Sequence, residues 1–271
     1  MKLDWMEQTM TTNHALDVLT EAVSEHQPTA LFAMFSGGHD SLVTTHITAR
    51  HPAFTAVVHL NTGIGIEETR EFVRATCAEQ GWPLLEKTPP RMTYEDICQR
   101  FGMMGGPKGH EVMYHRLKGE SLNILVAETK THRHDRIVLS TGVRSAESAR
   151  RMRLHKDAIR RDGVKVWVNP ILKWTSQEVN AYIEDHGLRR NEVVDKLHRS
   201  GECLCGSFAR PGELDEIAFW YPEVADRIRR MEKQCFDAGL PWNWGSARSP
   251  IPHKDQTSFL DLCQSCQTKW D

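Results

Sequence analysis

Residues 30–41 read ALFAMFSGGHDS, an apolar run followed by two glycines and a polar segment. The run from Ala30 to Phe35 has the length of a buried strand, and the text from Asp40 to Arg50 is typical of a helix. Gly37 and Gly38 lie between them and permit close approach to the backbone. A turn of this kind exposes backbone N–H groups, which bind phosphate oxygens. The stretch therefore predicts a phosphate loop in an α/β protein.

The polar side chains of this loop extend its predicted chemistry. Ser36 and Ser41 supply hydroxyl donors, and Asp40 either caps the helix or helps to hold a magnesium ion. The string differs from the Walker A pattern GxxxxGK[ST]. Taken alone, SGG also fits an ordinary strand-to-helix turn with a serine or aspartate cap. The phosphate interpretation therefore depends on the rest of the chain.

Strand and helix patterns alternate through the first two thirds of the sequence. Further apolar runs typical of buried strands lie at 56–60, 136–140 and 164–168. Amphipathic segments typical of helices lie at 14–25, 67–80 and 121–130. This alternation predicts a parallel sheet covered by helices. From about residue 200 the composition changes, with paired cysteines, several prolines and four of the eight tryptophans. We therefore expect two domains, 1–199 and 200–271.

Composition excludes several classes of protein. Of the 271 residues, 39% are hydrophobic and 26% are charged, with a net charge of -2, as in ordinary globular proteins. No stretch approaches the ~20 apolar residues that cross a bilayer, and the N-terminus lacks a signal-peptide core. We therefore expect a cytoplasmic protein with no membrane partner. Residues 144–165 hold eight Lys or Arg against three acidic residues, a local basic segment that predicts contact with phosphate groups.

Three further segments follow the loop in order: HLNTGIGIEET at 59–69, STGVRSAESARR at 140–151 and VNPILKWTSQEVNAYI at 168–183. Each alone also fits a turn or a solvated helix. Together with SGGHDS they resemble the ordered motifs of the phosphoadenosine phosphosulfate (PAPS) reductase-like PP-loop ATP pyrophosphatases. The resemblance implies an adenine nucleotide alpha hydrolase-like fold. That fold is a twisted, parallel, five-stranded sheet with helices on both faces, here followed by a small cysteine-bearing helical module.

The resemblance also implies a site for ATP and Mg²⁺. The catalytic residues would be Asp40, Lys118, Arg144 and Arg151, and Lys118 lies in HRLKGESL, which resembles a lysine-bearing segment of the family. The two arginines would clamp phosphates and stabilise the departing pyrophosphate. The nucleotide-binding residues would be Ser36, Gly37, Gly38, Asp40, Ser41, Asn61, Thr62, Gly63, Gly142, Arg144, Ser148 and Arg151.

Four of the seven cysteines come in two tight pairs, Cys203 with Cys205 in CLC and Cys263 with Cys266 in CQSC. An odd number of cysteines without a secretory signal argues against a disulfide framework. Two pairs of thiolates predict a metal site. The family resemblance favours a [4Fe-4S] cluster over structural Zn²⁺, which the single-residue spacing of CLC fits less well. Four unliganded thiols are the remaining alternative.

The other cysteines, Cys77, Cys98 and Cys235, are scattered singly. We expect them to be small core residues. A persulfide on Cys98 or Cys235 is a further option.

Cysteine placement also separates the candidate functions. Adenosine phosphosulfate (APS) reductases carry a cysteine pair just before the lysine segment and a C-terminal ECGLH, whereas residues 113–116 are MYHR and the sequence ends QSCQTKWD. The pattern is most similar to the ATP pyrophosphatases of DNA phosphorothioation systems. This implies adenylation of a substrate oxygen followed by sulfur transfer. A cysteine desulfurase, other sulfur-modification proteins and nucleic acid, above all DNA, would be the partners.

Three alternatives stay open. The first is a PAPS or APS reductase that releases sulfite. The second is a tRNA-thiolation-type enzyme, and the third is a non-catalytic nucleotide-binding iron-sulfur subunit.

Overall fold

The computed structural model describes the backbone of residues 5–145 and 157–245, and side chains from residue 12 onward within those ranges. Two compact units are present. The first comprises residues up to 61, 67–87 and 121–202, and the second comprises 62–66, 88–120 and the described residues from Cys203 onward. The expected boundary between residues 199 and 200 stays a prediction. No helix in the described ranges is both long and apolar enough to span a membrane.

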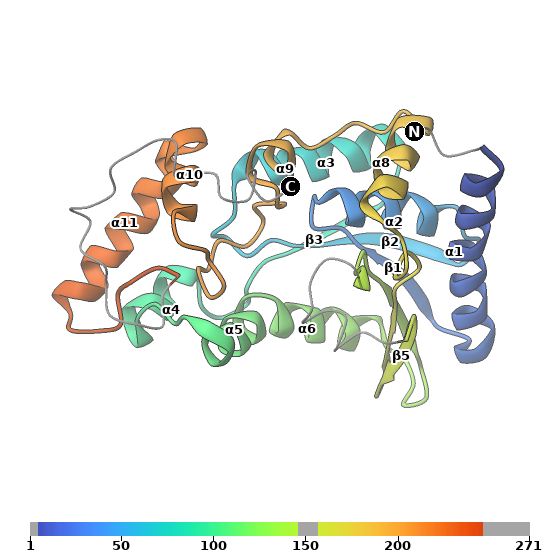
Figure 1. Cartoon of the computed structure of the whole chain (residues 1–271). Helices are drawn as coiled ribbons and strands as arrows, with labels where there is room; N and C mark the ends of the chain where they lie inside the picture. The colour runs from blue at the N-terminus through green and yellow to red at the C-terminus, as the bar shows by residue number, and fades with distance from the viewer. Residues whose placement is uncertain (1–4, 146–156, 246–271) are drawn as a thin grey trace. The chain divides into compact units, whose positions relative to one another are not determined.

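A six-stranded sheet forms the centre of the first unit, in the order β3-β2-β1-β4-β6-β5. Among these strands, Figure 1 labels β1, β2, β3 and β5. The strands are β1 (Ala30–Met34), β2 (Phe54–Leu60), β3 (Leu84–Lys87), β4 (Ile137–Ser140), β5 (Ile159–Asp162) and β6 (Lys165–Val168). Every neighbouring pair is parallel except β5 with β6. The α/β fold is confirmed, but the predicted strand count of five is wrong.

The apolar runs identified neither β3 nor β5, and the sequence of β5, IRRD, has no apolar run. This strand pairs antiparallel with β6 in a hairpin, and Asp162 lies opposite Lys165. Gly163 makes the turn with a φ of +61°, a conformation that glycine adopts at low cost. An edge strand buries little side-chain surface, so its polar sequence is compatible with pairing but gives no strand signal.

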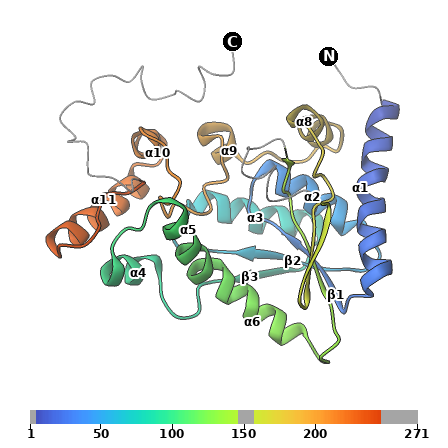
Figure 2. The same ribbon diagram turned by 60° about the horizontal axis from the view of Figure 1, so that its bottom comes forward.

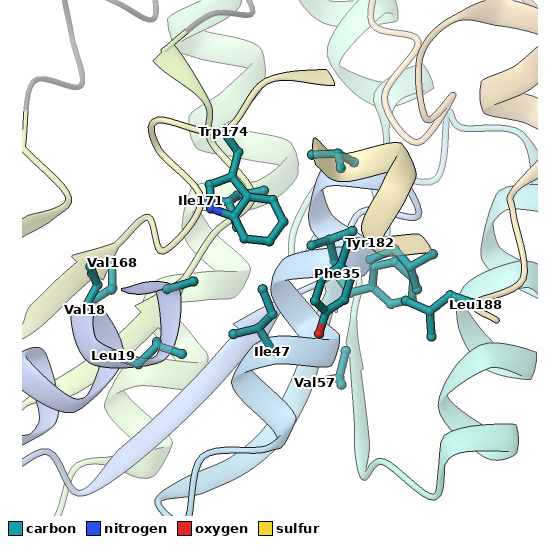
Figure 3. Packing of buried hydrophobic residues seen from close by; sticks show 14 of the residues in the cluster. Val18, Leu19, Phe35, Ile47, Val57, Val168, Ile171, Trp174, Tyr182 and Leu188 are labelled. Carbon is teal, nitrogen blue, oxygen red and sulfur yellow. The ribbon is translucent and has the colours of Figure 1, made fainter. Parts of the chain in front are cut away.

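Helices cover both faces of the sheet, as expected (Figures 1 and 2). On one face lie α1 (Trp5–His26), α2 (His39–Ala49), α3 (Glu67–Gln80) and α8 (Ser176–Asp185). Their apolar side chains form the larger core with strand residues such as Val57 and Val168 (Figure 3). On the other face, α6 (Glu120–Thr129) packs on Phe32, Val58 and Leu139. Adjacent residues of each strand therefore serve opposite layers.

The second unit is helical. It contains α4 (Tyr94–Phe101), α5 (Gly106–Tyr114), the π-helical turn η1 (His115–Gly119), α10 (Glu213–Trp220) and α11 (Pro222–Asp237). The α4 helix begins with a capping box between Thr93 and Asp96. It is joined to α11 by an ion pair in which Arg227 Nε lies 2.7 Å from Glu95 Oε1. The short helix α9 (Glu192–Leu197) belongs to the first unit.

Candidate functional site

The loop between β1 and α2 is closed by its own serines. The hydroxyls of Ser36 and Ser41 lie 3.1 Å apart, and Ser41 Oγ donates to the carbonyl of Gly38 at 2.8 Å. Gly37 has a φ of +79°, and a Cβ added there would lie 2.6 Å from the methyl group of Thr69. Glycine is therefore required at this position by both its backbone conformation and its surroundings.

The loop presents backbone donors at the start of α2. Within the described part of the chain, the N–H groups of Gly37 and Gly38 donate to no protein acceptor. Gly38 is the N-cap of α2 and has no capping side chain. Because the N-terminus of a helix carries partial positive charge and unpaired N–H groups, this loop can bind an anion.

Asp40 and Arg144 meet beside the loop. Arg144 Nε lies 2.9 Å from Asp40 Oδ2, and the arginine side chain is only 9% exposed. Arg144 Nη1 also donates to the carbonyl of Trp174 at 3.3 Å. Both residues were predicted from separate motifs, and the structure brings them into one ion pair. A guanidinium fixed here can neutralise negative charge that arrives at the loop.

Gly142 explains how β4 approaches α2 so closely. A Cβ on Gly142 would lie 2.6 Å from the backbone nitrogen of Ser41 and 2.7 Å from the carbonyl carbon of Asp40. These contacts are with backbone atoms, which cannot rotate away as a side chain can. Gly142 is therefore a spacing residue between the two segments.

Asn61, Thr62 and Gly63 follow β2 directly, and the division into units falls between the first two. The Asn61 amide donates to Glu86 Oε1 at 2.7 Å in the first unit. Arg74, which binds the same carboxylate, is the main cause that lowers the pKa of Glu86 to about 2. In the second unit Thr62 is buried, and the carbonyl of Gly63 accepts from Arg227 at 2.8 Å.

Lys118 lies on η1 in the second unit, in the electrostatic neighbourhood of Cys203. Cys203 and Cys205 interact through their thiols. The hydrogen bond between them is the first cause that lowers the pKa of Cys205 and raises that of Cys203. Cys205 Sγ also lies 3.4 Å from Ser207 Oγ. A thiol whose pKa is lowered is the kind that ligates a metal or acts as a nucleophile.

The other predicted ligands and two predicted phosphate contacts, Cys263, Cys266, Ser148 and Arg151, lie outside the described residues. In the ranges that the structure does describe, no group of three or more His, Cys, Asp or Glu is arranged to hold a metal ion. The metal centre stays a prediction. Cys77, Cys98 and Cys235 are buried, which confirms them as core residues.

Several residues around the loop carried no assigned role in the sequence analysis. His59 lies fully buried on β2, and its Nδ1 is 2.7 Å from the carbonyl of Phe35, so this nitrogen donates. Its Nε2 lies 3.1 Å from the buried carboxylate of Glu202. Asn191 donates to the carbonyl of Gly37 at 2.8 Å. No local pattern could have found these partners, because they come from distant parts of the chain.

His39, the variable residue of SGGHDS, also acquires partners. Its Nδ1 lies 3.2 Å from Arg190 Nη2, and Arg190 in turn binds Asp195 at 2.7 Å. Burial, followed by the charge of Arg190, lowers the pKa of His39 to about 4. The imidazole is therefore neutral at neutral pH, and Arg190 rather than His39 supplies positive charge at this end of the loop.

Comparisons with known proteins agree with this fold. An uncharacterized 37.8 kDa protein of Escherichia phage 186 is 28% identical over 148 residues, which are 54% of this chain and 44% of the phage protein. The match thus spans less than half of that relative. The PAPS reductase of Candida auris, solved as a phosphate complex, superposes with a TM-score of 0.51 at 18% identity, covering 72% of this chain and 93% of that one.

A second solved structure, the FMN adenylyltransferase of Candida glabrata with FMN and an ATP analogue, has a TM-score of 0.51 at 12% identity. It covers 70% of this chain and 62% of that one. At these identities the superpositions establish the fold alone. The phosphoadenosine phosphosulfate reductase domain family matches residues 30–207, which is more than half of the sequence. The matched range begins with β1 and takes in the phosphate loop, Arg144 and Cys205, and the chain therefore belongs to the phosphoadenosine phosphosulfate reductase domain family.

Proposed function

We propose that this protein is an ATP pyrophosphatase that adenylates a substrate oxygen for sulfur transfer, and that the substrate is DNA undergoing phosphorothioate modification. The observation that carries the first part is the phosphate loop itself. It combines the N–H groups of Gly37 and Gly38, which donate to no acceptor among the described residues, with the Asp40–Arg144 pair at the N-terminus of α2. This arrangement suits a polyphosphate, because several donors and one fixed cation converge on the anion.

In the proposed reaction a substrate oxygen attacks the α-phosphorus of ATP. The new O–P bond forms as the bond from that phosphorus to the α,β-bridging oxygen breaks, and pyrophosphate leaves with the electron pair. The loop N–H groups and Arg144 bind the developing negative charge. Asp40 and Ser41 have the hard oxygen atoms that Mg²⁺ prefers and would hold the ion, which supplies further charge neutralisation when bound.

A cysteine desulfurase would deliver sulfur as a persulfide, in concert with other sulfur-modification proteins. The terminal sulfur of the persulfide attacks the activated phosphorus, a P–S bond forms, and AMP leaves with the oxygen that it carries. A thiol reductant then cleaves the remaining S–S bond, which leaves the sulfur on phosphorus and the two thiols joined as a disulfide. Cys203 and Cys205 have thiols placed side by side, which is compatible with soft-metal ligation. With Cys263 and Cys266 they would hold a [4Fe-4S] cluster, or alternatively Zn²⁺, which would staple the second unit.

Nucleic acid as the substrate is supported by the basic segment. In the described part of that segment, Arg160 and Arg161 lie exposed on the edge strand β5. Exposed arginines on a sheet edge can contact a phosphate backbone without disturbing the core. By contrast, Arg144 from the same segment is buried in the site. In this proposal Arg144 therefore serves the nucleotide, whereas Arg160 and Arg161 face solvent and are available to DNA.

The test is an anaerobic assay of the full chain with ATP, Mg²⁺ and duplex DNA, following AMP and pyrophosphate. Pyrophosphate release that disappears in Asp40→Ala supports the proposed chemistry. Arg160→Ala/Arg161→Ala should weaken DNA binding and leave DNA-independent ATP turnover intact. Arg133→Ala removes another exposed arginine and serves as the control. Equal DNA binding by all three proteins would refute the DNA assignment.

The family match favours one second candidate, a reductase that releases sulfite from PAPS or APS. Sulfite formation with thioredoxin as the reductant, together with no turnover of ATP, would establish it in place of the pyrophosphatase. A tRNA-thiolation activity would appear as AMP formation that depends on tRNA rather than DNA. A non-catalytic nucleotide-binding subunit would bind ATP without producing pyrophosphate under any of these conditions.

A further inference from the structure

Asn191 lies next to the phosphate loop although it is 154 residues away in the sequence. It is the N-cap of α9, and its side-chain oxygen accepts from the N–H of Val193 at 3.0 Å. Its amide nitrogen donates to the carbonyl of Gly37 at 2.8 Å and to Thr69 Oγ1 at 3.3 Å. The residue is only 2% exposed. Every polar atom of this side chain is therefore engaged within the protein.

The direction of each hydrogen bond is fixed by chemistry. The carbonyl of Gly37 can only accept, so the side-chain atom of Asn191 that faces it must be the nitrogen. The hydroxyl of Thr69 on α3 donates to the carbonyl of Ser200 at 2.5 Å, which leaves its lone pairs for Asn191. The result is a buried chain of hydrogen bonds that joins the loop to α3 and to the segment after α9. Such a chain resists rotation of any one member.

The hydrogen bond from Asn191 fixes the orientation of the peptide plane between Gly37 and Gly38. In a trans peptide the carbonyl and the following N–H point in opposite directions. Fixing the carbonyl of Gly37 on Asn191 therefore fixes the N–H of Gly38 on the side away from Asn191. Two successive glycines offer little resistance to a flip of the plane between them. Without the amide, the donor that Gly38 presents would lose its fixed direction.

We propose that Asn191 is a positioning residue of the phosphate loop, which orients the N–H of Gly38 toward a bound polyphosphate by holding the carbonyl of Gly37. This inference rests on the proposed binding of ATP. It goes beyond the loop motif, because it assigns part of the anion affinity to a residue outside all four motif segments.

The decisive variant is Asn191→Asp. Aspartate keeps the oxygen that caps α9, so that helix retains its N-cap. It replaces the amide donor with a carboxylate oxygen, which the carbonyl of Gly37 repels. The matched control is Asn123→Asp on α6, which adds the same charge to the same unit on the other face of the sheet. Asn123 serves Lys165 only as an acceptor, at 3.1 Å from Nζ, and aspartate preserves that role.

Binding of ATP, pyrophosphate and adenosine to the full chain is measured by calorimetry. Asn191→Asp should raise the Kd for ATP and for pyrophosphate about tenfold or more, the range expected for loss of a buried hydrogen bond. The Kd for adenosine should stay unchanged, since adenosine has no phosphate. A residue with a merely structural role would shift all three ligands together. Asn123→Asp should resemble the wild type with every ligand.

Wild-type affinity for ATP and pyrophosphate in Asn191→Asp would overturn the inference. Should this variant fail to fold, Asn191→Ser provides a second test, because serine also caps a helix but cannot reach Gly37. If the wild-type chain binds pyrophosphate but never turns over ATP, the proposed function fails and the comparison of variants still decides the role of Asn191. If it binds neither ATP nor pyrophosphate, both fall.

Discussion

The closest backbone approach in the site, at Gly142, supports a quantitative prediction for Gly142→Ala. The new methyl group would lie 2.6 Å from the backbone nitrogen of Ser41 and 2.8 Å from the carbonyl oxygen of Asp40. Ordinary contacts of a carbon atom lie at about 3.5 Å or more. The end of β4 and the first turn of α2 must therefore separate by about 0.9 Å to restore an ordinary contact.

Overpacking of this kind costs about 1–3 kcal/mol. If the free and the ATP-bound chain carry the same strain, none of this cost reaches the ligand, and only the melting temperature falls. If the displaced turn is the one that binds phosphate, the cost appears as a loss of affinity of about 5- to 150-fold. We expect the second result, since both clashing residues belong to the predicted site.

The assay compares melting temperature and ATP affinity for Gly142→Ala and for Gly119→Ala. Gly119 is a suitable control because a Cβ there meets only the carbonyl of Tyr114, at 3.6 Å. Gly119→Ala should match the wild type in ATP affinity. Equal melting temperature and equal ATP affinity for Gly142→Ala and the wild type would refute the spacing role of Gly142.

The remaining predictions concern the loop and two ion pairs. Gly38→Ala should fold with a near-native melting temperature, because its Cβ would meet nothing closer than 3.6 Å. A melting temperature well below that of the wild type would contradict this. Arg144→Ala should lower the free energy of unfolding by about 3 kcal/mol in denaturant titrations, because it leaves the Asp40 carboxylate without its guanidinium. The double variant Arg144→Ala/Asp40→Ala should recover part of that free energy. The pKa of Glu86 is lowered from 4.5 to about 2, chiefly by Arg74, so this carboxylate stabilises the fold above pH 4.5 and loses that contribution as the pH falls toward 2. The difference in melting temperature between the wild type and Arg74→Ala should shrink across that window, and a constant difference would argue against the linkage.

The central fold was accessible from the sequence because its signals are local. The runs that became β1, β2, β4 and β6 are apolar enough to identify buried parallel strands. β3 and β5 gave weaker signals. β3 has the half-buried sequence LLEK, and β5 has the exposed sequence IRRD. Strands at the edge of a sheet bury less side-chain surface, so pairing rather than hydrophobicity defines them.

The candidate site was accessible only in part. Motif order indicated that Asp40 and Arg144 serve the same site, and they form an ion pair. The same motifs predict nucleotide binding by Asn61 and a catalytic role for Lys118, and both stay predictions. The structure adds that the Asn61 amide donates to Glu86 and that Lys118 lies in the second unit near Cys203. A motif identifies a residue type at a position, but hydrogen bonding decides what that side chain contacts.

The loop between β1 and α2 could be predicted from residues 30–41 alone, because they encode a buried strand, two glycines and a helix start. The family could be predicted from the order of four motifs along the chain. The groups that hold the loop in place became known only from the folded chain. Asn191 and Thr69 reach it from α9 and α3, and His59 reaches it from β2. The physical reason is that a backbone conformation with two glycines is held by contacts from other segments, and such contacts leave no periodic trace in the sequence.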